Sequence, residues 1–542
     1  MPDQESLDYL LHKDFLEDLL PKLGSEQWLP VYEHESYGND NLTIWCALLD
    51  EEAVERALSH DSWDLSIGHG QPGVTTSHVS GESVSTYYRY GEKNRIRPFL
   101  YSRYFSGAHA EYKEIEEEFR LYHNLAHDHD RNLLLDFDES GREIEVVRIT
   151  EQSVKVRLRY IRQYQAATQQ YLAIYFDSTR YSSLPIADVG EIRNSIADEK
   201  SRWTMGVSNC DFRDDYETFS HALGKVIIEP PPIEKSGMLP FKEDNDDKEV
   251  PFVIRVDGEG ESIEFSSNPD NLGDYFGGNP GAPHYLTPVF FRREVLSKYY
   301  SEPDRFKVTD GKLTCLNLWT CRIDNDQQSN VIVFLGDLGR DMPYSERLHW
   351  KGFNVVPDGG ISETKFRRGF LAEFADPKSP ELVFKAEYQK FCEDWKLKFN
   401  WHLYLPLTPD DSHLLDTLRI PVSNAQPEFD DQVLSLTKLL IDSINEKELA
   451  QKIEADTGEM QGIAKIEAFL NQSEVEGVTI VIPFLRSLQS LRSTGVAHRK
   501  GNRYKQALSR CNIDLKNKPD SFSRLLEQSI RILQILRVNF IE

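Results

Sequence analysis

The first third of the chain alternates between stretches with the apolar period of an α-helix and stretches with that of a β-strand. Apolar residues recur at three- and four-residue steps in Leu7–Leu23, Glu111–Ala126 and Tyr160–Gln170, which predicts amphipathic helices. The Gly-, Ser- and Thr-rich stretch Trp63–Ser83 is typical of a loop. Aromatic and β-branched residues predict strands at Leu42–Leu49, Ser85–Tyr104, Asn132–Phe137, Glu143–Ile149, Val154–Arg159 and Tyr171–Asp177. We therefore expect a mixed α/β or α+β domain over residues 1–190.

The middle of the chain, residues 191–425, contains more turn-forming and linker-like sequence. Breakers gather in Glu229–Pro232 and Asp274–His284, and Lys242–Glu249 is acidic. A helix is predicted at Ser379–Asn400. Strands are predicted at Phe252–Val256, Leu313–Trp319 and Asn330–Leu335. This pattern indicates a second mixed α/β or α+β domain.

After Ala425 the helical period dominates, and the one strand-like stretch is Val478–Ile482. Helices are predicted at Asp430–Ile444, Gln461–Leu470, Glu476–Leu491, Tyr504–Ile513 and Ser521–Val538. We expect an all-α bundle over residues 426–542, which is the size of one small domain.

Composition limits the classes of protein to which this chain can belong. A chain of 542 residues is longer than a single hydrophobic core can organise, so several domains are expected. No apolar run is long enough to span a bilayer. The N-terminal residues lack the basic start and apolar core of a secretory signal, so we expect a cytoplasmic protein without a membrane partner. Six scattered cysteines predict reduced thiols rather than a zinc ribbon or a disulfide framework.

The net charge of −27 disfavours nucleic-acid binding over the whole surface, yet one segment is basic. No carboxylate stands between Glu476 and Asp514. We call this segment the basic island, and its cations are Arg486, Arg492, Arg499, Lys500, Arg503, Lys505 and Arg510. A polyanion is the expected partner.

At the centre of the basic island, five residues separate Arg492 from His498, and one of them is Gly495. Similar arginine-to-histidine spacings occur at Arg103 with His109 and at Arg120 with His127, so spacing alone decides nothing. The pair Arg492 and His498 differs from these because it follows an amphipathic helix inside a predicted helical bundle.

In this context the C-terminal residues resemble the HEPN domains of prokaryotic defence and toxin systems. These domains are helical bundles whose signature is an arginine, four to six residues and a histidine. The resemblance implies that Arg492 and His498 are catalytic residues of a metal-independent endoribonuclease, which needs no cofactor. A histidine that titrates near neutrality moves the proton of a ribose 2′-hydroxyl, and arginine neutralises the phosphorane. The implied product is a 2′,3′-cyclic phosphate.

The resemblance also implies how RNA is held. Phosphate contacts are expected from Ser493, Arg499, Lys500, Arg503 and Lys505. Two positions differ from related domains. Ser493 stands where asparagine or aspartate is common, and Lys500 replaces the tyrosine that some toxins use for control by modification.

The implied biological role is abortive infection against phage. HEPN modules commonly dimerise, so a homodimer through the helical domain is expected. The large N-terminal part would sense an invader or restrain the nuclease, through a phage-derived trigger or a second defence protein. The acidic bulk of the chain would repel RNA until a rearrangement exposes the basic island.

Other interpretations remain open. Arg492 and His498 also suit an ordinary helix end with Gly495 as the C-cap, or a non-catalytic HEPN scaffold. A metal-dependent hydrolase around Asp337 and Asp341 is a further alternative, because the stretch Val331–Asp341 is a buried strand that runs into a polar turn. His123 and His127, four residues apart on a predicted helix, have the spacing of zinc ligands, but a solvated helix end is the simpler interpretation.

Overall fold

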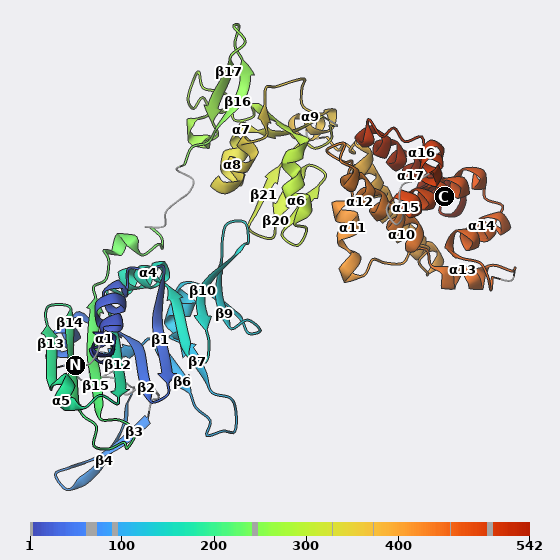
Figure 1. Ribbon diagram of the computed structural model, residues 1–542. Coiled ribbons are helices and arrows are strands. Elements are labelled where there is room, and N and C mark those ends of the chain that lie inside the picture. The colour runs from blue at the N-terminus through green and yellow to red at the C-terminus, as the bar shows by residue number, and fades with distance from the viewer. Residues whose placement is uncertain are drawn as a thin grey trace. The chain divides into compact units, whose positions relative to one another are not determined.

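The computed structural model describes residues 4–60, 73–88, 96–240, 248–327, 329–371, 373–455, 457–495 and 502–542. The chain divides into two compact units (Figure 1). The first unit consists of Met1–Asp138 and Arg142–Asp244, and the second of Glu139–Gly141 and Asn245–Glu542. Among the described residues, no helix combines the length and apolar character that crossing a bilayer requires.

The first unit is built on an 11-stranded antiparallel sheet in the order β13-β14-β15-β12-β2-β1-β11-β10-β9-β8, with β5 also paired to β2. Its strands are β1 (Trp28–Tyr37), β2 (Asp40–Leu49), β5 (Ile96–Pro98), β8 (Ala126–Asp128), β9 (Leu133–Phe137), β10 (Glu143–Ile149), β11 (Ser153–Arg157), β12 (Tyr171–Ser182), β13 (Ile192–Ala197), β14 (Ser201–Asn209) and β15 (Thr218–Ile228). Strands β13–β15 follow residue 190, the predicted end of the first domain, and they extend the same sheet.

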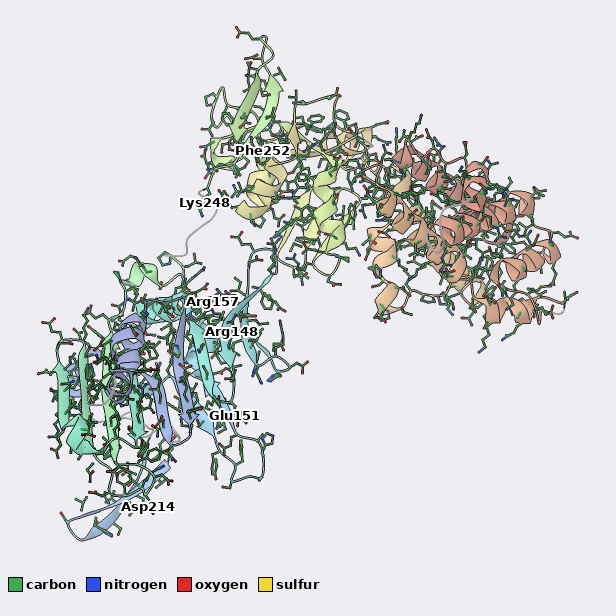
Figure 2. The ribbon with its side chains drawn as sticks, viewed as in Figure 1. Arg148, Glu151, Arg157, Asp214, Lys248 and Phe252 are labelled. Atoms are coloured by element: carbon green, nitrogen blue, oxygen red, sulfur yellow. The ribbon has the colours of Figure 1, made fainter. Side chains whose placement is uncertain are left out.

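The first unit also contains helices and two short hairpins. The helices are α1 (Gln4–Leu10), η1 (Asp14–Leu19), η2 (Leu20–Lys22), α2 (Glu51–Leu58), α3 (Glu117–Tyr122), α4 (Leu158–Thr168), α5 (Ile186–Val189) and η4 (Ile233–Lys235). The hairpins are β3 (Gly73–Val79) with β4 (Glu82–Tyr88), and β6 (Leu100–Arg103) with β7 (Tyr112–Ile115). On the sheet, Arg148 and Arg157 lie 4.1 and 4.9 Å from the ring centre of Trp28, and Figure 2 labels both arginines.

Two expectations for the first unit are wrong. The predicted helix Glu111–Ala126 is divided into β7, the short helix α3 and β8. Within the predicted loop Trp63–Ser83, the described residues from Gly73 onward begin the hairpin β3–β4. In both stretches, strand pairing with a neighbour outweighs the local sequence preference.

The second unit begins with a mixed part that has its own core. Its sheets are β16 (Pro251–Val256) with β17 (Ser262–Ser266); β22 (Asn330–Phe334), β18 (Pro288–Arg292) and β23 (Asn354–Val355); and β19 (Phe306–Thr309), β20 (Lys312–Cys315) and β21 (Trp319–Arg322). Its helices are η6 (Pro269–Asn271), η7 (Arg293–Leu296), α6 (Ser297–Ser301), α7 (Leu335–Asp341), α8 (Tyr344–Lys351) and α9 (Glu363–Phe370).

From Pro380 to Phe540 the second unit is helical, with one core that runs from Phe384 to Leu536. Its helices are α10 (Pro380–Phe399), η8 (Pro409–Asp411), α11 (His413–Thr417), α12 (Gln426–Thr437), η9 (Lys438–Asp442), α13 (Glu446–Lys452), α14 (Gly462–Gln472), α15 (Val478–Gly495), α16 (Asn502–Arg510) and α17 (Lys518–Phe540). The mixed architecture with a helical C-terminal region is confirmed. Helix α10 packs on α17 and contributes to the same core, so the helical region starts before residue 425.

The turn Glu139–Gly141 connects β9 and β10 but belongs to the second unit. Ser140 Oγ donates to Glu346 Oε1 at 2.8 Å, and its carbonyl oxygen accepts from Arg305 Nη1 at 2.8 Å. Trp319 Nε1 donates to the carbonyl oxygen of Glu139 at 3.1 Å. Through these bonds the turn provides hydrogen-bond partners for Glu346, Arg305 and Trp319 of the second unit.

Candidate functional site

Arg492 lies in the last turn of α15, where it holds one carboxylate in a fork. Its Nη1 and Nη2 atoms lie 3.2 Å from Oδ1 and 3.2 Å from Oδ2 of Asp442, which ends η9. The side chains of Arg492 and Asp442 are 34% and 39% exposed. Because solvent screens a pair of this exposure, the carboxylate is a weak competitor for a phosphate that reaches the guanidinium.

The helix ends that flank the motif lie side by side. A Cβ on Gly495, the last residue of α15, would lie 2.9 Å from Cε2 of Tyr504 in the first turn of α16. The ring of Tyr504 is 5% exposed, and its hydroxyl accepts a hydrogen bond from Gln426 Nε2 at 3.2 Å. Gly495 therefore allows the start of α16 to pack against the end of α15.

The other predicted phosphate-binding residues differ in their surroundings. Ser493 Oγ donates to the carbonyl oxygen of Ser490 at 3.2 Å, so its proton is engaged while its oxygen can still accept. Arg503 and Lys505 are exposed on α16 and have no ion-pair or hydrogen-bond partner in the described part of the chain. His498, together with Arg499 and Lys500, lies outside the described residues, so its convergence with Arg492 stays a prediction.

The histidine pair considered for zinc does not share a helix face. His123 caps the end of α3, where its Nε2 lies 2.9 Å from the carbonyl oxygen of Tyr160. Burial lowers the pKa of His123 to about 4. His127 stands in β8 and lies against His129, with ring centres 3.8 Å apart. Among the described residues, no three His, Cys, Asp or Glu side chains converge as metal ligands.

Asp337, the centre of the alternative hydrolase, lies in the first turn of α7 directly after β22 and is 5% exposed. Its Oδ1 accepts from Tyr285 Oη and from Arg340 Nη2, both at 3.0 Å. Arg340 Nε also lies 2.6 Å from Asp341 Oδ1. Burial raises the pKa of Asp337, although Tyr285 and Arg340 favour its charged form. Asp337 and Asp341 thus share one guanidinium.

Two glycines bring α7 close to its neighbours. A Cβ on Gly336 would lie 2.2 Å from Cδ2 of Tyr285, and a Cβ on Gly339 would lie 1.9 Å from the carbonyl oxygen of Ser267. The ring of Tyr285 therefore rests on the helix backbone, which places its hydroxyl on Asp337.

A cavity of about 500 Å³ opens beside Asp337. Its walls are formed by α7, α9, the turn between β19 and β20, and the chain that follows β21. The acidic side chains that line it are Asp310, Asp324, Asp326 and Asp337. The basic ones are Lys312, Arg322, Arg340, Lys365 and Arg368. The mixture of both signs is typical of a polar ligand site rather than of a hydrophobic one.

Two of the acidic side chains accept from donors within α9 and at its N-cap. Arg368 holds Asp310 with both terminal nitrogens, at 2.9 and 2.7 Å. Asp324 is 2% exposed, and its Oδ2 accepts from the backbone nitrogen of Ser362 at 2.7 Å.

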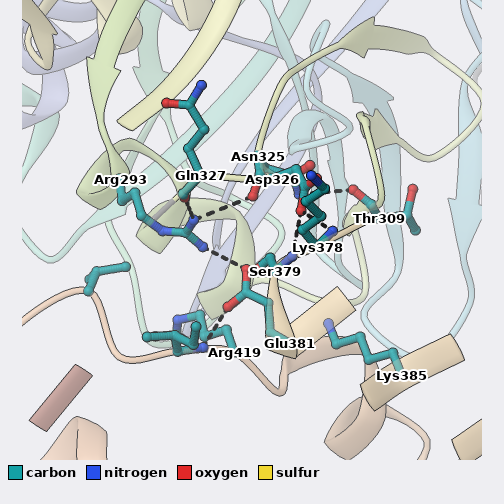
Figure 3. A network of polar contacts seen from close by, with 12 residues as sticks. Arg293, Thr309, Asn325, Asp326, Gln327, Lys378, Ser379, Glu381, Lys385 and Arg419 are labelled. Carbon is teal, nitrogen blue, oxygen red and sulfur yellow. Dashed lines mark hydrogen bonds and ion pairs between the residues drawn. The ribbon is translucent and has the colours of Figure 1, made fainter. Parts of the chain in front are cut away.

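Asp326 belongs to a network of polar contacts on the side of α10, shown in Figure 3. Its Oδ1 accepts from the backbone nitrogens of Lys378 and Ser379, and its Oδ2 accepts from Thr364 Oγ1 at 2.6 Å. Deeper in the same network, Arg293 Nη2 lies 2.6 Å from Glu381 Oε1. These bonds fix the loop after β21, and with it the cavity wall.

Three cations of the cavity lack such bonds. The side chains of Lys312, Arg322 and Lys365 have no ion-pair or hydrogen-bond partner among the residues that the structure describes. Sequence reasoning found Asp337 but missed these cations and Tyr285, because they come from three elements and a turn and stand in no recognisable spacing.

No protein-family model, no curated protein and no solved structure matches this chain.

Proposed function

We propose that this protein is a metal-independent endoribonuclease with Arg492 and His498 as its catalytic pair. The observation that carries the proposal is the fork of Arg492 on Asp442 at a partly exposed helix end. An arginine that presents two N–H groups to two carboxylate oxygens presents the same geometry to two oxygens of a phosphodiester.

In the proposed reaction, a ribose 2′-hydroxyl attacks the adjacent phosphorus, and the 5′-oxygen of the next nucleotide leaves. His498 takes the proton of the attacking hydroxyl or gives one to the leaving oxygen. Arg492 neutralises the charge that develops on the phosphorane oxygens. The products are a 2′,3′-cyclic phosphate and a 5′-hydroxyl, and the step uses no metal.

Exposed cations of α16 would hold the RNA strand beside this pair. Arg503 and Lys505 point to solvent in the first turn of α16, next to the end of α15 that carries Arg492. With Arg499, Lys500 and Ser493, they contact phosphates and position the strand without reading its bases.

The biological role follows from the HEPN resemblance alone. The enzyme acts as a homodimer in abortive infection, and its N-terminal region responds to a phage-derived trigger or to a second defence protein.

The test is cleavage of end-labelled single-stranded RNA by the purified full-length protein in the presence of EDTA. We expect cyclic-phosphate products from the wild type. Arg492→Ala and His498→Ala should each lose at least about a hundredfold in rate, the usual effect of removing a catalytic donor or acid–base group.

Arg486→Ala is the matched control, since Arg486 is an exposed cation of the same helix and is paired with Glu467. Its rate should equal that of the wild type. Cleavage that EDTA abolishes, or that His498→Ala leaves intact, would contradict the proposal. RNA binding without cleavage would favour a non-catalytic scaffold instead.

A further inference from the structure

We propose that the cavity beside Asp337 binds a phosphorylated nucleoside. In this proposal, Lys312, Arg322 and Lys365 hold the phosphate, and the base stacks on Phe370. The site is distinct from the motif of Arg492 and does not depend on ribonuclease activity.

Two neighbouring cations of the cavity form an uncompensated pair of like charges. Lys312 of β20 and Arg322 of β21 are direct cross-strand partners, and both are exposed along the cavity. Like charges directly opposite each other destabilise a sheet. No carboxylate of the described chain bonds to either side chain. An anion between the two cations would remove this repulsion.

Lys365 supplies a third positive charge from α9. Its side chain is half-buried, and Nζ lies 4.8 Å from the ring centre of Phe334. Burial lowers the pKa of Lys365, Arg322 lowers it further, and the charges of Asp337 and Asp324 oppose the effect. Arg322 and Lys365 line the same cavity. A bound phosphate would favour the charged ammonium.

The position of Lys365 is set by the N-terminus of its helix. Ser362 Oγ accepts from the backbone nitrogen of Lys365 at 3.0 Å, which caps α9. The backbone nitrogen of Ser362 in turn donates to the buried carboxylate of Asp324. Asp324 therefore accepts its hydrogen bond from the backbone rather than from Lys365. The side chain of Lys365 lines the cavity.

Aromatic rings form the outer part of the site. Phe370 lines the cavity and is 43% exposed. Its ring stacks on that of Phe366, with centres 5.5 Å apart and planes at 23°, and it meets the edge of Phe334 at 6.0 Å. Such exposed rings are platforms for stacking bases. The volume of about 500 Å³ lies within the usual range for small-molecule sites.

The test is isothermal titration calorimetry of the full chain with AMP and GMP, compared with adenosine and with inorganic phosphate. We expect at least one nucleotide to bind with a Kd below about 1 mM, and at least tenfold more tightly than adenosine or phosphate. Binding should weaken as salt increases, because the contacts are ionic.

Lys365→Met and Arg322→Ala should each weaken nucleotide binding at least tenfold. Phe370→Ala should weaken nucleotide binding but leave the weaker binding of inorganic phosphate unchanged. Arg367→Ala is the matched control: Arg367 lies on the same helix, is paired with Glu373 and does not line the cavity, so affinity should not change.

Circular dichroism establishes that each variant is folded. If Lys365→Met does not fold, Arg322→Ala still tests the proposal, because it changes an exposed strand position. The proposal is overturned if neither nucleotide binds, or if Lys365→Met and Arg322→Ala bind as tightly as the wild type. Equal affinity for phosphate and nucleotide, with no effect of Phe370→Ala, would overturn the role of the base.

Discussion

His12 is a fully buried histidine in a left-handed backbone conformation. Its φ is 54°, its exposed fraction is 0%, and Nε2 lies 2.9 Å from Oγ of Ser220. Burial, with the nearby charge of Arg180, lowers the pKa of His12 to about 3. The imidazole is therefore neutral at physiological pH, and protonating it requires a charge inside the core.

This pKa predicts acid sensitivity. Between about pH 3 and pH 6.5 the unfolded chain binds a proton at His12 that the folded chain does not, so stability falls as pH falls through this range. From this group alone we expect the free energy of unfolding to be about 2 kcal/mol lower at pH 5 than at pH 7. Urea denaturation at both pH values measures the difference.

His12→Asn is the control, because asparagine stays neutral and tolerates positive φ. The loss between pH 7 and pH 5 should be smaller in this variant by about the same 2 kcal/mol. An identical loss in wild type and variant would assign the acid sensitivity to other groups.

For single residues, the sequence shows which side chains are charged but not which of them meet in the folded chain. Arg492 is visible in the sequence because a basic segment interrupts an acidic chain. Its partner Asp442 is 50 residues away and gives no signal. Lys365 likewise resembles any surface lysine until Asp324, through Ser362, sets the start of its helix.

Among the elements, α10 shows how a helix joins the core of the helical region. Trp395 is 1% exposed and meets the rings of Phe399, Trp401 and Phe540 at centre distances of 4.7, 5.4 and 5.1 Å. On the same helix Leu397 is 83% exposed. The two residues differ by two positions, which at 3.6 residues per turn places them on opposite sides.

Trp395→Ala should lower the free energy of unfolding of the second unit by about 3 to 5 kcal/mol, because it leaves a large cavity among aromatic rings. Leu397→Ala should change it by less than about 0.5 kcal/mol. Denaturant unfolding of full-length variants, followed by tryptophan fluorescence and circular dichroism, gives both values. Similar effects of the two substitutions would contradict this account of α10.

Most elements with a strong apolar period were predicted, with the stretch Glu111–Ala126 as an exception, while strands with few apolar residues were missed. The helices α10, α14 and α17 match their predicted ranges closely, as do the strands β2 and β9–β11. Strand β15 was missed because, of its six buried positions, only Ile227 is strongly apolar. The others are Thr218, Ser220, Ala222, Gly224 and Lys225, which carry little apolar signal. Gly224 is required there, since a Cβ would lie 2.1 Å from Cβ of Trp203.

At the scale of the whole molecule, the second unit is discontinuous in sequence, because it includes the turn Glu139–Gly141 as well as Asn245–Glu542. Glu346, in α8, is 0% exposed and lies 2.7 Å from Lys298 Nζ and from Tyr299 Oη. Ser140, from the turn between β9 and β10, supplies a further donor. Burial alone would raise the pKa of Glu346, but these three hydrogen bonds outweigh it and lower the pKa.

Ser140→Ala should therefore destabilise the second unit by about 1 to 2 kcal/mol, because a buried carboxylate loses one of its donors. Calorimetry of the full-length chain measures the effect. In the double variant Ser140→Ala with Glu346→Ala, the two losses should not add, since both substitutions break the same bond. Simple additivity would show that the bond contributes nothing.

The turn Glu139–Gly141 also limits how this protein can be truncated into separately expressed fragments. A gene fragment that starts at Asn245 encodes the helices and small sheets of the second unit but omits the acceptors for Arg305 and Trp319. During translation this turn leaves the ribosome long before the residues that it contacts. Truncated versions should therefore be designed to keep β9, β10 and the turn between them.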